Sequence, residues 1–153
     1  MSNSFDFDLF TTASKPIPLA TEVNYLSLAT IEEVADGFLP TGSYYICDPP
    51  VMDTDKDYVV YVTNMDRRIE LERQLVTAGW ERGGSFFVNT DDPASFVSLR
   101  HDSRNIILTE NLHDFDGFRA ATALAKRLNL TAKADRVALF QAVRHHKICE
   151  TKT

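Results

Sequence analysis

The sequence predicts an α/β (α+β) domain, with a mixed β-sheet flanked by helices and a C-terminal helical pair. Three patterns support this class. β-Branched and aromatic residues fill Tyr58–Tyr61, which is typical of a buried strand. Two apolar runs, Phe96–Leu99 and Asn105–Thr109, flank a short polar turn, as the strands of a hairpin do. From Asp114 to Val143, apolar residues recur at helical spacing.

Shorter elements are predicted before the sheet. Thr30–Pro40 indicates a helix, because Thr30 and Glu33 have the spacing of a capping box. Tyr44–Ile46 indicates a strand that ends at a proline pair. The chain therefore enters the sheet through a short helix and a short strand.

The next segments predict a helix and a connection. The helix begins at Asn64 or Asp66 and ends near Ala78, with Gly79 at its C-terminal cap. The connection contains a turn, a short strand and a loop, at Arg82–Gly84, Ser85–Val88 and Asn89–Pro93. Two further helices follow, the first ending at Asn129 and the second capped by Thr131.

These elements indicate one domain between two terminal segments. The predicted boundaries are an N-terminal arm at 1–20, a domain at 21–148 with its sheet core at about 41–110 and its helical tail at about 114–147, and a tail at 149–153. The arm alternates Phe5, Phe7 and Leu9 with aspartates, a strand pattern. We expect it to pack on its own domain. A homodimer contact through the arm is the alternative.

Composition excludes several classes of protein. The 153 residues are 44% hydrophobic and 25% charged, as in globular proteins. The net charge of −6 argues against a broad basic surface for long nucleic acid. No apolar run approaches the ~20 residues of a membrane-spanning helix, so no membrane partner is expected. The N-terminus lacks the pattern of a signal peptide, and the two cysteines, Cys47 and Cys149, have no paired spacing. A cytoplasmic location is expected.

Candidate metal ligands lie at the start of the central strand. Asp55 and Asp57 are one residue apart, so their side chains point to the same face of the sheet. Asp53 has the same parity. Mg²⁺ prefers such oxygen ligands and usually takes one or two carboxylates with substrate phosphates. Upstream, Gly42 lets the backbone approach a phosphate. An acidic turn without a ligand is the alternative.

The spacing resembles a known signature. Gly42 and Ser43 are followed by 11 residues and then by Asp55-Lys56-Asp57 at a strand start. This pattern is similar to that of the nucleotidyltransferase-fold (polymerase-beta-like) superfamily. Two segments resemble small stand-alone members from tailed bacteriophages, namely Asn105–Thr109 and the run from Ala123 to Ala142. The resemblance covers about residues 30 to 145, and it implies a nucleotidyltransferase-like sheet.

The resemblance implies roles for individual residues. Asp55 and Asp57 would hold Mg²⁺ or Mn²⁺, and Gly42 and Ser43 would hold the β- and γ-phosphates of a nucleoside triphosphate (NTP). The reaction would be transfer of a nucleotidyl group to an unknown acceptor, which is a protein, an RNA or a small molecule. A phage origin would place the protein in the host cytoplasm, with a host protein as one possible partner.

Cations near the triphosphate are also implied. Lys126 or Arg127, on the helix after the last strand, would contact the phosphates. Arg100 and Arg104 are rival candidates.

One position departs from the family pattern. Active members carry a third carboxylate on a later strand, and here the aligned residue is Asn105. An amide cannot act as a base at neutral pH. Asp102 and Glu110 are acidic alternatives outside the expected position. Lys56 is also unusual, and strand parity directs it to the opposite face.

Two principal hypotheses follow, with a third beside them. The first is a metal-dependent nucleotidyltransferase with Asn105 beside the catalytic Asp55 and Asp57. The second is a catalytically degenerate module that binds a nucleotide or a host protein and interferes with a host process. The third is an interaction protein that uses the aromatic arm.

Overall fold

A computed structural model describes residues 16–21, 24–52, 54–83 and 96–152, with side chains up to residue 143. Within these ranges the strands form a five-stranded sheet in the order β1-β2-β5-β4-β3. The strands are β1 (Gly37–Thr41), β2 (Lys56–Tyr61), β3 (Glu81–Arg82), β4 (Phe96–His101) and β5 (Arg104–Thr109). The helices are α2 (Leu28–Val34), α3 (Gly42–Ile46), α4 (Met65–Thr77), α5 (Leu112–Leu128) and α6 (Lys133–Lys152).

The sheet is mixed, which confirms the predicted fold class. Strands β2 and β5 run parallel, and the other neighbouring pairs are antiparallel. Strands β4 and β5 form the predicted hairpin, in which Asp102 takes a left-handed conformation with φ of 54°. Aspartate tolerates that conformation better than most residues. The parallel pair at the centre fixes which residues lie side by side at the start of β2.

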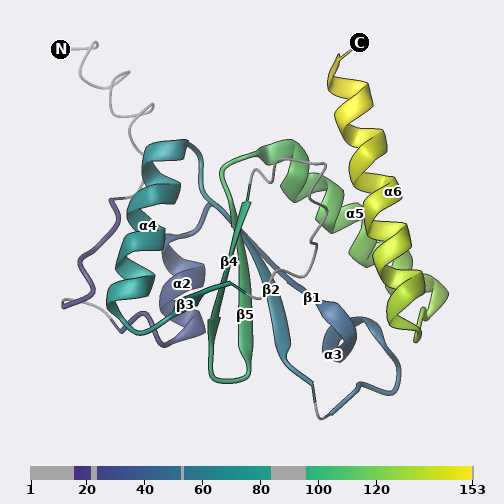
Figure 1. Cartoon of the computed structure of the whole chain (residues 1–153), viewed down its shortest axis with the longest axis horizontal. Coiled ribbons are helices and arrows are strands. Elements are labelled where there is room, and N and C mark those ends of the chain that lie inside the picture. The colour runs from purple at the N-terminus through teal and green to yellow at the C-terminus, as the bar shows by residue number, and fades with distance from the viewer. Residues whose placement is uncertain (1–15, 22–23, 53, 84–95, 153) are drawn as a thin grey trace, which may run out of the picture.

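Helices cover both faces of the sheet (Figure 1). On one face, α2 and α4 enclose a core that includes Leu71, Trp80 and Ile106. On the other face, α5 and α6 enclose a core that includes Val59, Phe115 and Phe140. Strands that are buried on both faces have near-continuous apolar sequences, as Tyr58–Tyr61 has.

The predicted helix at Thr30–Pro40 is wrong in its second half. Helix α2 ends at Val34, and Gly37–Thr41 forms the edge strand β1, antiparallel to β2. Pro40 is tolerated there because an edge strand has one side without a strand partner. Gly37 is also required by packing, since a Cβ atom would lie 2.7 Å from Cζ of Phe115.

The predicted strand at Tyr44–Ile46 is also wrong. These residues belong to the short helix α3, which begins at Gly42 directly after β1. Gly42 has a φ of +79°, which turns the chain out of the sheet. Tertiary packing of Ile46, 1% exposed, on the α5 face outweighs the strand propensity of the two tyrosines.

The remaining elements follow the prediction closely. Asn64 caps α4 by accepting a hydrogen bond from the Arg67 amide at 2.8 Å, and Asn129 ends α5 with φ of 50°. Arg82 lies in strand β3 where a turn was expected. Helix α6 begins at Lys133, two residues after the predicted cap Thr131. The predicted strand at 85–88 and loop at 89–93 lie outside the described residues.

The described end of the predicted arm packs on its own domain. Ile17 and Ala20 contact the core on the α4 face, and the Ala20 amide donates to Gln74 Oε1 at 2.7 Å. The aromatic residues at positions 5, 7 and 10 lie outside the described residues. The homodimer contact therefore stays a prediction.

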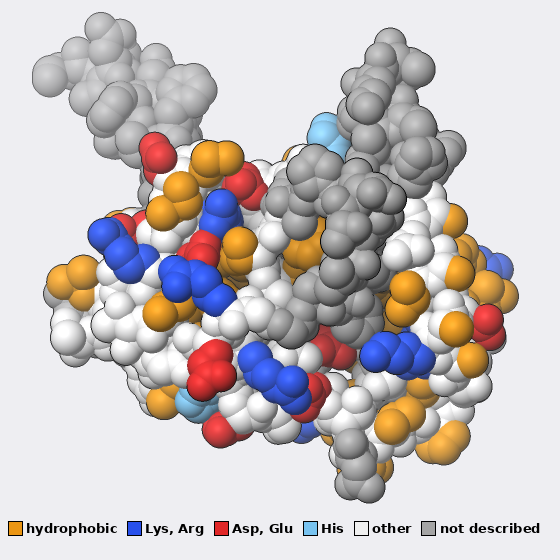
Figure 2. Space-filling model, in the orientation of Figure 1, with side chains coloured by type: hydrophobic (Ala, Val, Ile, Leu, Met, Phe, Trp, Pro, Cys, Tyr) orange, Lys and Arg blue, Asp and Glu red, His pale blue; other side chains and the backbone are white. Residues whose placement is uncertain are grey.

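Acidic and basic side chains are interspersed over the face shown in Figure 2. No helix in the described ranges has the length and apolar character needed to cross a bilayer.

Candidate functional site

The start of β2 brings two carboxylates and an amide together. Because β2 and β5 pair in parallel, Asp57 lies directly beside Asn105. The Asn105 Nδ2 group donates to Asp57 Oδ1 at 2.9 Å and to Asp55 Oδ2 at 3.3 Å. The three side chains therefore converge on one point.

Gly42 closes one side of this point. A Cβ atom built on Gly42 would lie 2.0 Å from Asp57 Oδ2, so any larger residue would displace the carboxylate. The next residue, Ser43, donates from its hydroxyl to Thr54 Oγ1 at 3.3 Å. The Gly-Ser pair and the acidic segment thus meet across the β1–α3 junction.

The electrostatics of Asp57 favour a cation. Asp57 is 7% exposed, and burial raises the pKa of its carboxyl above the ordinary value of 3.8. The Asn105 hydrogen bond lowers this pKa, the Asp55 carboxylate raises it, and Lys133 and Arg100 lower it. A divalent cation between the two carboxylates would offset both burial and repulsion.

Three basic residues surround the carboxylates. Arg100 donates to Asp55 Oδ2 from strand β4. Lys133 and Arg136, from the first turns of α6, line the same cavity as the carboxylates. Of these, Arg136 is 7% exposed. Its Nη1 group donates to the carbonyls of Leu130 at 3.0 Å and Thr131 at 2.9 Å.

The guanidinium of Arg136 retains one unused donor. Its Nε is buried and has no hydrogen-bond partner among the described residues. A buried donor without a partner costs about 1–3 kcal/mol. Because Nε is buried, it is not exposed to a ligand in the adjoining cavity.

The cavity itself is small and polar. Its volume is about 140 Å³, and its lining consists of Ser43, Thr54, Asp55, Asp57, Asn105, Lys133 and Arg136. This volume suits a metal ion and phosphate groups better than a whole nucleotide.

Two residues that the sequence placed at the site lie elsewhere. Lys126 lines a separate cavity with its ammonium group 3.9 Å from the centroid of the Tyr45 ring. Arg104 donates to the carbonyl of Leu26 at 2.6 Å and lies over the Trp80 ring. The structure therefore does not bring these cations to the carboxylates. Of the rival candidates, Arg100 is the one at the site.

The proposed acidic alternatives to Asn105 also lie elsewhere. Asp102 is in the β4–β5 turn with its side chain 77% exposed, and Glu110 forms an ion pair with Arg68 at 3.6 Å. Asp53 is outside the described residues. Lys56 faces away from the carboxylates, as strand parity predicted, with its ammonium group 4.7 Å from the centroid of the Tyr44 ring.

Sequence reasoning missed Lys133, Arg136 and Thr54. Thr54 directly precedes Asp55, so its position gave a signal that was not used. Lys133 and Arg136 lie three residues apart at the start of a helix, which indicates one shared face. Only the packing of α6 against α5 shows that this face reaches β2.

The residues present fit one divalent cation. No group of three or more His, Cys, Asp or Glu side chains converges within the described ranges. Two carboxylates are nevertheless sufficient for Mg²⁺ when phosphates supply the remaining oxygen ligands. The fit is supported by the Gly42 cradle against Asp57 and by the raised pKa of that residue. A second cation would find no third carboxylate beside Asp57, because the partner of Asp57 on β5 is Asn105.

Comparison with known proteins identifies the fold. No family model matches the chain, and no curated protein matches its sequence. A solved structure, that of conserved protein GrpB from Enterococcus faecalis, matches with a TM-score of 0.50 and 14% sequence identity. The match covers 90% of this chain and 97% of that one. The chain therefore shares the mixed α/β fold of GrpB.

Proposed function

We propose that the carboxylate cavity binds an NTP with one Mg²⁺ or Mn²⁺ and transfers its nucleotidyl group to an acceptor hydroxyl. One observation carries the proposal. The carboxylates of Asp55 and Asp57 share a single cavity with the basic side chains of Lys133 and Arg136. A metal–phosphate ligand needs this combination, because carboxylates bind the cation while ammonium and guanidinium groups bind phosphate oxygens.

Each residue has a defined task in this proposal. Asp55 and Asp57 hold the cation, which when bound neutralises phosphate charge. Gly42 leaves room for the Asp57 carboxylate itself, because a Cβ atom there would lie 2.0 Å from Asp57 Oδ2. Lys133 and Arg136 line the cavity and attract the triphosphate through their positive charges.

The transfer requires no base from the protein. The acceptor oxygen forms a bond to the α-phosphorus, and the bond from the α-phosphorus to the bridging oxygen breaks. Pyrophosphate leaves, and the hydroxyl proton passes to water because Asn105 cannot accept it. We therefore expect turnover slower than in members with a third carboxylate.

The second candidate function is nucleotide or host-protein binding without transfer. Asn105 favours it, because its amide donates to both carboxylates and cannot act as a base. The two candidates share the same cavity and differ in whether the nucleotide is cleaved.

Incubation of the protein with α-labelled NTPs, Mg²⁺ and host-cell extract tests the proposal. Transfer predicts label on an extract component, and the double variant Asp55→Asn/Asp57→Asn should lose it. Asp66→Asn, an exposed carboxylate change on α4, is the matched control and should retain transfer. Metal-dependent binding without labelling would favour the second candidate. Labelling by the double variant would contradict both.

A further inference from the structure

A second cavity lies between β1, α3 and α5. Its volume is about 410 Å³, and its lining consists of Leu39, Tyr45, Arg119, Thr122, Ala123, Lys126 and Arg127. This volume falls in the ~300–1,000 Å³ range of small-molecule sites. None of these residues lines the carboxylate cavity.

The interior of this cavity is apolar and includes an aromatic ring. Leu39 and Ala123 supply aliphatic surface, and Tyr45 is 41% exposed. The hydroxyl of Thr122 is paired with that of Thr41 at 2.7 Å. The cavity therefore offers a flat ligand a stacking surface rather than a set of hydrogen-bonding groups.

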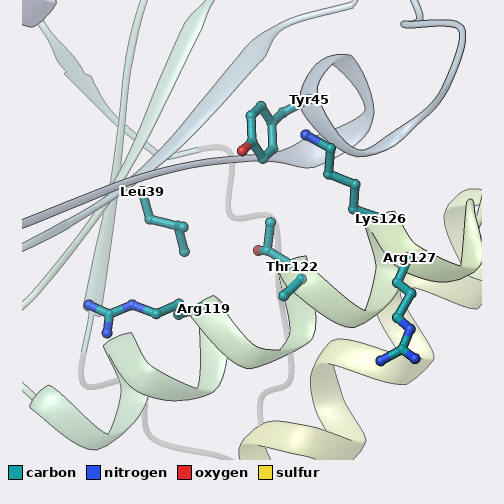
Figure 3. Close-up of a pocket in the computed structure, with 7 residues that line it drawn as sticks. Leu39, Tyr45, Arg119, Thr122, Lys126 and Arg127 are labelled. Atoms are coloured by element: carbon teal, nitrogen blue, oxygen red, sulfur yellow. The ribbon is translucent and has the colours of Figure 1, made fainter.

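The charged residues of the lining are all basic. Figure 3 shows the Lys126 side chain directed at Tyr45, while Arg119 and Arg127 extend away along α5 on either side. Arg119 has an acidic neighbour, Asp116, at 3.8 Å. Among the residues that the structure describes, Lys126 and Arg127 have no carboxylate within ion-pair distance. The cavity thus complements an anion, although the chain carries a net charge of −6.

Helix α3 connects this cavity to the carboxylate cavity. Ser43 lines the carboxylate cavity and Tyr45 lines the second one, so the same short helix contributes to both. A ligand on Tyr45 would lie on the other side of α3 from a metal–NTP ligand.

We propose that the second cavity binds a nucleotide unit without a metal. The base would replace the Lys126 ammonium group on the Tyr45 ring, where that group now lies 3.9 Å from the ring centroid, and the phosphate would bind the ammonium group beside the ring. An aromatic platform with adjacent cations binds the two halves of a nucleotide, because every base has a π face and every phosphate is anionic. If this nucleotide is the acceptor, that role rests on the proposed nucleotidyl transfer. Binding of a nucleotide in the second cavity does not depend on the transfer.

Equilibrium binding of nucleoside monophosphates in EDTA tests this proposal. We use AMP, GMP, CMP and UMP in one arm and a short single-stranded RNA in the other. At least one nucleotide should bind, and Lys126→Ala and Tyr45→Leu should each weaken it by about tenfold or more. Lys126→Arg and Tyr45→Phe should retain binding. Arg73→Ala, an exposed cation on α4, is the matched control.

The two arms separate the sources of the nucleotide. Equal affinity for RNA and monophosphate indicates a free nucleotide, and tighter RNA binding with the same variant sensitivity indicates a chain end. The proposal is overturned if neither ligand binds in EDTA, or if folded Lys126→Ala and Tyr45→Leu bind as wild type does. Asp55→Asn/Asp57→Asn should leave this binding unchanged, so its result is independent of the metal site.

Discussion

The Nδ2 group of Asn105 lies 2.9 Å from Oδ1 of Asp57, its direct neighbour on the parallel strand. The same group also reaches Asp55 at 3.3 Å. The amide therefore supplies hydrogen-bond donors between two carboxylates that would otherwise repel each other. It stabilises the site without a cation, whereas a carboxylate in its place would make a cation necessary.

Asn105→Asp should make the fold depend on divalent cations. Without metal, a third carboxylate would replace two hydrogen bonds with repulsion, and we expect a loss of about 1–3 kcal/mol in the free energy of unfolding. Mg²⁺ or Mn²⁺ should restore this stability and raise nucleotidyl transfer above the wild-type rate. Urea unfolding with and without metal, followed by turnover measurements, checks both effects.

Asn105→Ala is the control for that variant, because it removes the donors without adding a charge. Asn105→Ala should also be less stable than the wild type, but metal should restore less of its stability than it restores in Asn105→Asp. A metal-free Asn105→Asp protein as stable as wild type would contradict the role assigned to the amide.

Asp57 should give the stability a specific pH dependence. Burial raises the pKa of Asp57 above 3.8, so the folded protein retains a proton that the unfolded chain has already released. This contribution to stability is present below pH 3.8 and is lost as the pH rises through the raised pKa. Asp57→Asn should lack this loss. Unfolding free energies measured in a pH series for both proteins give the comparison.

The stabilisation that Mg²⁺ gives should change over the same pH range as the Asp57 contribution. It should increase where the Asp57 contribution decreases. The cation binds the charged carboxylate, so the stabilisation that Mg²⁺ gives should increase as the pH rises through the pKa of Asp57. Mg²⁺ stabilisation that is equal on both sides of this window would show that the cation binds elsewhere.

Gly42→Ala should damage both stability and metal–nucleotide binding. Its Cβ would lie 2.0 Å from Asp57 Oδ2, and φ is +79°. We expect a loss of about 1–3 kcal/mol. Gly83→Ala is the matched control, because φ is +120° there and no atom of the described residues lies within 4 Å of the added Cβ. The control should lose stability and retain Mg²⁺-dependent NTP affinity, measured by calorimetry. Equal losses of affinity in both variants would contradict a local effect at Asp57.

Lys133→Ala should weaken NTP binding with little effect on stability. The side chain is exposed and borders the carboxylate cavity. Removal of one phosphate-binding cation should raise the dissociation constant of Mg²⁺–NTP by about tenfold, and the unfolding free energy should change by less than about 0.5 kcal/mol. Lys126→Ala, on the last turn of α5, is the comparison and should retain Mg²⁺-dependent binding. Equal weakening of Mg²⁺–NTP binding by both variants would contradict the placement of the triphosphate beside Lys133.

The central strands and long helices were predictable because their patterns are local. Tyr58–Tyr61 has strand composition throughout, and Asn64 and Asn129 have the chemistry of helix caps. The β1–α3 segment was not predictable in this way. Its strand is fixed by pairing with β2, and its helix by Gly42 and the burial of Ile46, which are tertiary effects.

The candidate site was predictable to a similar extent. Asp55 and Asp57 were identified from a spacing, and Asn105 was identified from an alignment. Asp57 and Asn105 are partners on adjacent strands, and Asp55 directly precedes the first of these strands. The basic residues at the site were not identified from the sequence, because Lys133 and Arg136 reach the cavity only through the packing of α6 on α5. Lys126 has the same chemistry, but its position on α5 directs it to the opposite side of α3.

The most direct test is an NTP titration of the wild-type protein and the Asp55→Asn/Asp57→Asn variant, each with Mg²⁺ and with EDTA. Monophosphate at saturating concentration fills the second cavity throughout. The metal–phosphate site predicts NTP binding by wild type in Mg²⁺ only, and loss of that binding in the folded double variant. Equal binding in EDTA, or unchanged binding in the double variant, would contradict the assignment of this cavity.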